Sequence, residues 1–115
     1  MGHAYFLTFP PMTQAQFLSS IAALTQGAPL YSQENIADPR IRVKLFDIAG
    51  SATWYLTEYD SVSHIAFGYV TGLACDEWGT VSIDELMELR WHGIPRVEID
   101  RHFAPTNFKC ITGLA

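Results

Sequence analysis

The run from Arg40 to Ser82 constrains the fold most, because it joins four β-rich segments with only short breaks between them. The segments read R-I-R-V-K-L-F-D-I, A-T-W-Y-L-T-E-Y-D, H-I-A-F-G-Y-V-T-G-L-A and E-W-G-T-V-S. Their β-branched and aromatic residues are typical of strands. Such short breaks allow antiparallel neighbours, whereas a parallel crossover needs about a dozen connecting residues or more. The sequence therefore predicts an antiparallel meander sheet.

Helix signals lie on both sides of this run. Thr13 and Gln16 match the T-x-x-Q capping box, and apolar residues at helical spacing follow them. Ser82 and Glu85 form a second capping box, S-I-D-E, which predicts a helix that ends near Gly93. We therefore expect an α+β fold, with an antiparallel meander sheet of four to six strands and two short helices packed on it.

The segment from Thr53 to Asp60 carries bulky side chains at both alternating sets of positions, which favours a central strand. Strict alternation places Glu58 on the same side as Trp54 and Leu56. In the next segment the small residues, among them Gly68, share one face, so a helix or another backbone could approach closely there. Residues 4–9 and 96–103 are predicted as a first and a last strand.

Length and composition predict one domain in residues 1–115. Within it we expect a short strand and an added helix over 1–27, an α+β core over 28–108 and a tail over 109–115. A hydrophobic content of 49% excludes a disordered chain. The net charge of −5 argues against direct binding to a phosphate backbone.

Targeting signals and cysteine usage predict a cytoplasmic protein. The sequence has no apolar run as long as the roughly 20 residues of a membrane span, and its first residues lack the basic start of a signal peptide. The two cysteines, Cys75 and Cys110, are too few for a disulfide scaffold and are expected to be reduced.

Residues 1–33 contain no Asp, Glu, Lys or Arg. The exposed face of a helix usually carries charge, so the uncharged helix near the N-terminus is expected to be partly covered. Packing within the monomer would cover it. The alternative is that the chain is a structural homo-oligomer that associates through residues 1–33.

Several sequence blocks, in a fixed order, resemble a known family. They are P-L-Y-S-Q-E, V-K-L-F, T-W-Y-L-T-E-Y-D, F-G-Y-V-T-G-L, E-W-G-T-V-S-I-D-E-L, G-I-P-R-V-E-I-D and F-A-P-T. Between about residues 28 and 108 the chain is similar to small bacterial proteins catalogued as domain of unknown function 2958. The resemblance implies genes carried on plasmids and other mobile elements, and it implies no activity. The N-terminal third, with its added helix, departs from the pattern.

Glu58 is the first candidate for acid–base chemistry, because a carboxyl group beside apolar side chains can serve as a general acid or base. With Asp60 or His102 as its partner, it would make the chain a small hydrolase or transferase. The alternative is a carboxylate at the sheet rim that pairs with one of three basic residues, Arg42, Lys44 or Arg96.

A metal site is not expected. Glu98, Asp100 and His102 share one side of the predicted last strand, but alternate residues are about 7 Å apart along a strand. That spacing is too long for all three to reach one ion. No cofactor motif such as a P-loop or G-x-G-x-x-G occurs, so no cofactor is expected either.

Acidic residues gather around the predicted second helix. With one tryptophan they form the candidate partner-binding set Asp76, Glu77, Trp78, Asp84, Glu85 and Glu88. Helix starts favour acids, and tryptophan is common in cores, so a purely structural role is the simpler explanation. Alternatively, an acidic face can imitate a phosphate backbone, and Trp is a frequent anchor of interfaces. The leading hypothesis is a non-enzymatic interaction module of a bacterial mobile element, acting as an acidic inhibitor of a nucleic-acid-binding host defence protein.

Overall fold

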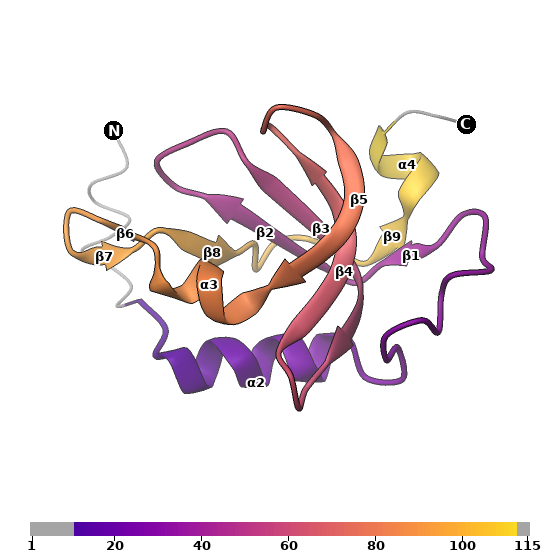
Figure 1. Ribbon diagram of the computed structural model, residues 1–115, viewed down its shortest axis with the longest axis horizontal. Helices are drawn as coiled ribbons and strands as arrows, with labels where there is room; N and C mark the ends of the chain where they lie inside the picture. Colours follow the sequence, from indigo (N-terminus) through magenta and orange to yellow (C-terminus); the bar gives the residue numbers. More distant parts are fainter. Residues whose placement is uncertain (1–10, 113–115) are drawn as a thin grey trace.

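The computed structural model describes residues 11–112, which form a five-stranded antiparallel sheet in the order β5-β4-β3-β2-β8 (Figure 1). The strands are β2 Val43–Asp47, β3 Thr53–Asp60, β4 Ile65–Thr71, β5 Glu77–Ser82 and β8 Val97–Ile99. Strands β2 to β5 follow one another both in sequence and in space. The predicted α+β fold with a meander sheet is confirmed.

Helices and two small strand pairs complete the described part of the chain. The helices are α2 Gln14–Leu24, α3 Ile83–Glu88 and α4 Phe108–Thr112. The strand pairs are β1 Arg40–Ile41 with β9 Thr106–Asn107, and β6 Arg90–Trp91 with β7 Ile94–Pro95. Helices α2 and α3 were expected, whereas α4 is additional. The strand predicted over residues 4–9 lies outside the described residues.

The hydrophobic core lies between one face of the sheet and helices α2 and α3. Phe17 and Ile21 of α2 and Ile83 of α3 are buried in one cluster with side chains from the five strands. The sheet contributes Val43, Leu45, Trp54, Leu56, Tyr59, Ala66, Val81, Val97 and Ile99. Helix α2 begins at the expected capping box, in which the Thr13 hydroxyl accepts the N–H of Gln16 and the Gln16 side chain accepts the N–H of Thr13. The capping box fixes where this helix begins beside the sheet.

A β-bulge interrupts the alternation of β3. Leu56 lies opposite Gly68, but Glu58 lies opposite Phe67, so Thr57 is an extra residue on β3. Beyond the bulge Tyr59 faces the core, while Glu58 faces the other side of the sheet with Phe67. The prediction that Glu58 shares a side with Trp54 and Leu56 is therefore wrong, because one inserted residue reverses the alternation after it.

The second helix and the last strand are both shorter than expected. Helix α3 ends at Glu88, and a hairpin of β6 and β7 follows it. His92 and Gly93 have φ values of 52° and 81°, as the two central residues of a type I′ turn require. Gly93 thus serves a hairpin rather than a helix end. Strand β8 ends at Ile99, and Asp100 then accepts the backbone N–H of His102 in a turn.

An ion pair fastens the turn after β2 to the segment before β8. The Nε of Arg96 donates to Oδ1 of Asp47 at 2.8 Å, and the N–H of Ala49 donates to the same oxygen at 2.9 Å. The Asp47 side chain is 9% exposed. The Arg96 guanidinium holds the pKa of Asp47 below its ordinary value of 3.8. The ionised carboxylate therefore stabilises this edge of the fold.

The backbones of β3 and β4 approach each other closely at Gly68. A Cβ at Gly68 would overlap the carbonyl oxygen of Tyr55 and lie 2.9 Å from Leu56 Cα, whereas a Cβ at its cross-strand neighbour Gly79 meets nothing within 4 Å. We expect Gly68→Ala to lower the free energy of unfolding by about 1–3 kcal/mol, because the β3 backbone must shift. Gly79→Ala should be neutral or slightly stabilising. Urea unfolding of both variants measures this, and equal stabilities would contradict the close approach.

The Asp47–Arg96 pair predicts a pH dependence of stability. The pKa of Asp47 lies below its ordinary value of 3.8 in the folded state, so the ionised side chain stabilises the fold fully at pH values above 3.8. This stabilisation is lost as the pH falls through the lowered pKa. Asp47→Asn should lower the free energy of unfolding at neutral pH and weaken its decline in acid. Urea unfolding across this acid range is the measurement. If the free energy of unfolding of Asp47→Asn fell as steeply in acid as that of the original protein, the Asp47–Arg96 pair would not be the cause of the pH dependence.

Candidate functional site

Aromatic side chains from three elements gather on the face of the sheet opposite the core. Phe67 and Tyr69 come from β4, Trp78 from β5 and Phe108 from α4. The ring centroids of Trp78 and Phe108 are 4.7 Å apart, and those of Tyr69 and Phe108 are 4.9 Å apart. The rings of Phe67 and Trp78 are stacked at 5.8 Å. We call these four residues the aromatic cluster. It attaches α4 to the sheet.

The Glu58 carboxylate anchors the connector over residues 30–39 beside this cluster. Glu58 is 3% exposed. Its Oε1 accepts the backbone N–H of Tyr31 at 2.8 Å, and its Oε2 accepts that of Gln33 at 2.9 Å. Tyr31 has a φ of 73°, so the chain turns sharply at this anchor. The connector, which is irregular as expected, is thus held against the sheet by a side chain that the bulge places there.

A cavity of about 260 Å³ lies between the connector and the aromatic cluster. Thr57 and Glu58, the two residues at the bulge, both line it. The other lining residues are Gln33, Glu34, Ile36, Ala37, Pro39, Phe67, Trp78 and Phe108. The cavity combines aromatic rings with two carboxylates.

The proposed catalytic partners of Glu58 lie elsewhere. Asp60 and His102 do not line the cavity. Asp60 accepts hydrogen bonds from the Ser63 hydroxyl and from the N–H groups of Val62 and Ser63, and these donors hold its pKa below the ordinary value. An Asp60 carboxyl that stays ionised is a poor general acid. His102 is exposed in the turn after β8.

The basic residues considered as partners of Glu58 do not pair with it in the described part of the chain. Lys44 Nζ lies 3.5 Å from Oδ2 of Asp100, and Arg96 binds Asp47. Within residues 11–112 no ion pair joins Glu58 to Arg42 or to any other basic side chain. Within this described part of the chain, the hydrogen bonds that the Glu58 carboxylate accepts all come from backbone amides.

No metal site is evident in the described part of the chain. No three His, Cys, Asp or Glu side chains among residues 11–112 gather closely enough to hold an ion. Asp100, one of the three residues considered for such a site, is engaged by Lys44 and by the N–H of His102. Cys75 and Cys110 are both exposed free thiols.

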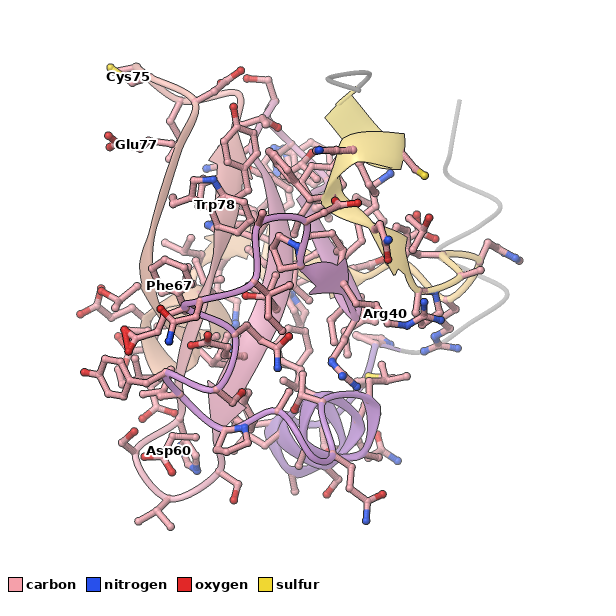
Figure 2. The ribbon with its side chains drawn as sticks, turned by 90° about the vertical axis from the view of Figure 1, so that its right-hand side faces the viewer. Arg40, Asp60, Phe67, Cys75, Glu77 and Trp78 are labelled. Carbon is pink, nitrogen blue, oxygen red and sulfur yellow. The ribbon has the colours of Figure 1, made fainter. Side chains whose placement is uncertain are left out.

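The acidic candidates lie along one edge of the sheet in two groups rather than in one cluster. Asp76 and Glu77 stand where β5 begins, and the second group, Asp84, Glu85 and Glu88, lies on α3 directly after β5 ends. Five steps of about 3.3 Å separate the ends of β5, so the strand between the two groups is roughly 17 Å long. Glu77 and Trp78 point to opposite sides of β5, and only Trp78 reaches the cavity (Figure 2).

Strand β5 is the outermost strand on this side of the sheet. The N–H of Ile83 donates to the carbonyl of His64, and Ser82 is opposite Ile65. In an antiparallel ladder this pattern turns the backbone groups of Trp78 and Thr80 away from β4. Among residues 11–112 no further strand pairs with β5, so within the described part of the chain it offers a free edge between the two acidic groups.

The chain belongs to the family described as Protein of unknown function (DUF2958), whose model matches residues 12–110. The resemblance over residues 28–108 is therefore confirmed. The match also covers α2, so the helix treated as an addition to the family pattern lies inside the matched region. Comparisons with curated proteins and with solved structures give no match. Among residues 11–112, the helices are all too short or too polar to cross a membrane.

The anchoring role of Glu58 predicts the effect of Glu58→Gln. One glutamine oxygen can still accept an amide, but its NH₂ group then faces the other backbone N–H. We expect the free energy of unfolding to fall by about 1–3 kcal/mol. Hydrogen exchange should also become faster at the amides of Tyr31 and Gln33.

Glu34→Gln is the matched control, because Glu34 is exposed on the same connector. It should change stability by less than about 0.5 kcal/mol. If Glu58→Gln were equally harmless and left the two amides protected, the carboxylate would not be the anchor.

Proposed function

We propose that the protein is a non-enzymatic interaction module of a bacterial mobile element that acts in the cytoplasm. Its partner would be a host protein that binds nucleic acid, and the sharpest version is inhibition of a defence nuclease. The observation that carries the proposal is the free edge of β5, which has acidic side chains at both of its ends. The mobile-element setting follows from what the family resemblance implies.

The charge of this edge suits a basic partner. Proteins that grip a phosphate backbone do so with Lys and Arg, and these side chains would be attracted to exposed carboxylates in the same way. Glu77, Glu85 and Glu88 are exposed. Acidic groups at the two ends of a strand roughly 17 Å long could contact several basic side chains of one binding groove at the same time.

The backbone of β5 adds a second mode of attachment. An extended segment of a partner can join a free strand edge through main-chain hydrogen bonds, with side-chain pockets nearby supplying specificity. At the middle of the strand Gly79 has no side chain, and a Cβ there would meet nothing within 4 Å, so the sheet face beside this position is open. Charge and backbone thus act on one continuous surface.

The geometry favours binding over the alternative of a small hydrolase or transferase. Catalysis by Glu58 needs a second reacting group within hydrogen-bond reach. Asp60 and His102 do not line the cavity beside Glu58. Association of the chain with itself through residues 1–33 stays a prediction.

A capture experiment from nuclease-treated bacterial lysate tests the proposed function. The immobilised protein should retain a nucleic-acid-binding protein that excess duplex DNA displaces, because both would occupy the same basic surface. The variant E77Q/E85Q/E88Q should retain at least about tenfold less of it, since three exposed charges are lost.

The control variant S19K/A23K/Q26K changes the net charge by the same amount at exposed positions on and beside α2. It should retain the partner as well as the original protein does. Two results would refute this function: equal retention of the partner by E77Q/E85Q/E88Q and by the original protein, or capture of a partner that duplex DNA does not displace.

A further inference from the structure

The cavity beside the connector has a lining that is acidic and aromatic. Glu58 and Glu34 contribute carboxylates, and Phe67, Trp78 and Phe108 contribute rings. No Lys, Arg or His is among the described residues that line it. Aromatic faces attract cations through their quadrupole, and carboxylates attract them through charge, so both features favour the same kind of occupant.

Glu58 is a buried carboxylate without a counter-cation among residues 11–112. Buried charges in proteins are usually paired, because desolvation without pairing is costly. The amides of Tyr31 and Gln33 occupy one acceptor site on each oxygen. A carboxylate offers about four acceptor sites, so two remain beyond these amides, and Glu58 is one of the residues that line the cavity.

The size of the cavity limits what can enter. Its volume of about 260 Å³ lies below the range of roughly 300–1,000 Å³ that is typical of sites for drug-sized ligands. One long side chain is a better fit for this space than a nucleotide or another extended small molecule.

We propose that this cavity binds the guanidinium group of an arginine side chain on the partner protein. Arginine is favoured over lysine because its planar fork can donate two parallel hydrogen bonds to a carboxylate while its face lies on an aromatic ring. Glu58 would accept those bonds, and Trp78 would supply the ring. Glu34, exposed at the edge of the cavity, would add attraction without being buried.

The position of Trp78 joins this cavity to the proposed binding edge. Trp78 belongs to the outermost strand β5, and it also lines the cavity. A partner segment that lies along β5 would therefore have the cavity within reach of one of its side chains. The inference rests on the proposed function for the identity of the partner, but binding of arginine itself can be tested without that partner.

The test uses the full chain and three capped tripeptides that differ at the central residue: arginine, lysine and citrulline. Citrulline keeps the shape of arginine and removes its charge. In an NMR titration, the arginine peptide should shift the indole N–H signal of Trp78 and the amide signal of Gln33 in a saturable way. The lysine peptide should bind more weakly, and the citrulline peptide at least about tenfold more weakly than the arginine peptide.

Two tryptophan variants locate the binding site. Trp78→Leu should weaken binding of the arginine peptide at least about tenfold, whereas Trp91→Leu, on the β6–β7 hairpin outside the cavity, should leave it unchanged. Equal binding of arginine and citrulline, binding of lysine as tight as that of arginine, or full affinity in a folded Trp78→Leu protein would each overturn the proposal.

Failure of this inference and failure of the proposed function give different results. If the arginine peptide binds but no host protein is captured, the cavity assignment stands and the inhibitor function falls. If a host protein is captured through the acidic edge while the peptide does not bind, the function stands and the cavity assignment falls.

Discussion

The extra residue at Thr57 is the constraint on which both faces of the sheet depend. It turns Tyr59 into the hydrophobic core and turns Glu58 outward, where two backbone amides bind its carboxylate. Without the bulge, strict alternation would place a carboxylate among the buried side chains beside Leu56, at a high desolvation cost. The same insertion therefore protects the core and creates the anchor for the connector over residues 30–39.

The two faces of the sheet are consequently covered in different ways. One face is closed by α2 and α3 around a continuous apolar cluster that accounts for the stability of the fold. Within residues 11–112, the connector and α4 cover the other face, and a cavity lies between them. The side chains of the sheet that line this cavity are therefore positioned by strands whose opposite face packs in the hydrophobic core.

The sequence predicted the features that local chemistry encodes. Both predicted N-caps begin helices, at Thr13 and Ser82, and the β-rich segments form a meander because their connections are short. The prediction from sequence failed where the position of a side chain depends on how neighbouring strands pair. Nothing in T-W-Y-L-T-E-Y-D shows that Thr57 has no residue opposite it on β4. The predicted side of the sheet for Glu58 was therefore wrong. The aromatic cluster was not predicted as a unit, because its rings come from three separate elements, β4, β5 and α4.

The charges at the ends of β5 also bear on whether this edge could pair with a second copy of the chain. An outermost strand with unpaired backbone groups is a template for edge-to-edge aggregation, and flanking like charges are a common safeguard. Antiparallel pairing of two β5 strands would bring Asp76 and Glu77 of each copy beside the carboxylates that α3 carries on the other. Electrostatic repulsion would then oppose the pairing. A basic chain meets no such repulsion, so the same edge can stay closed to identical copies and open to a foreign partner.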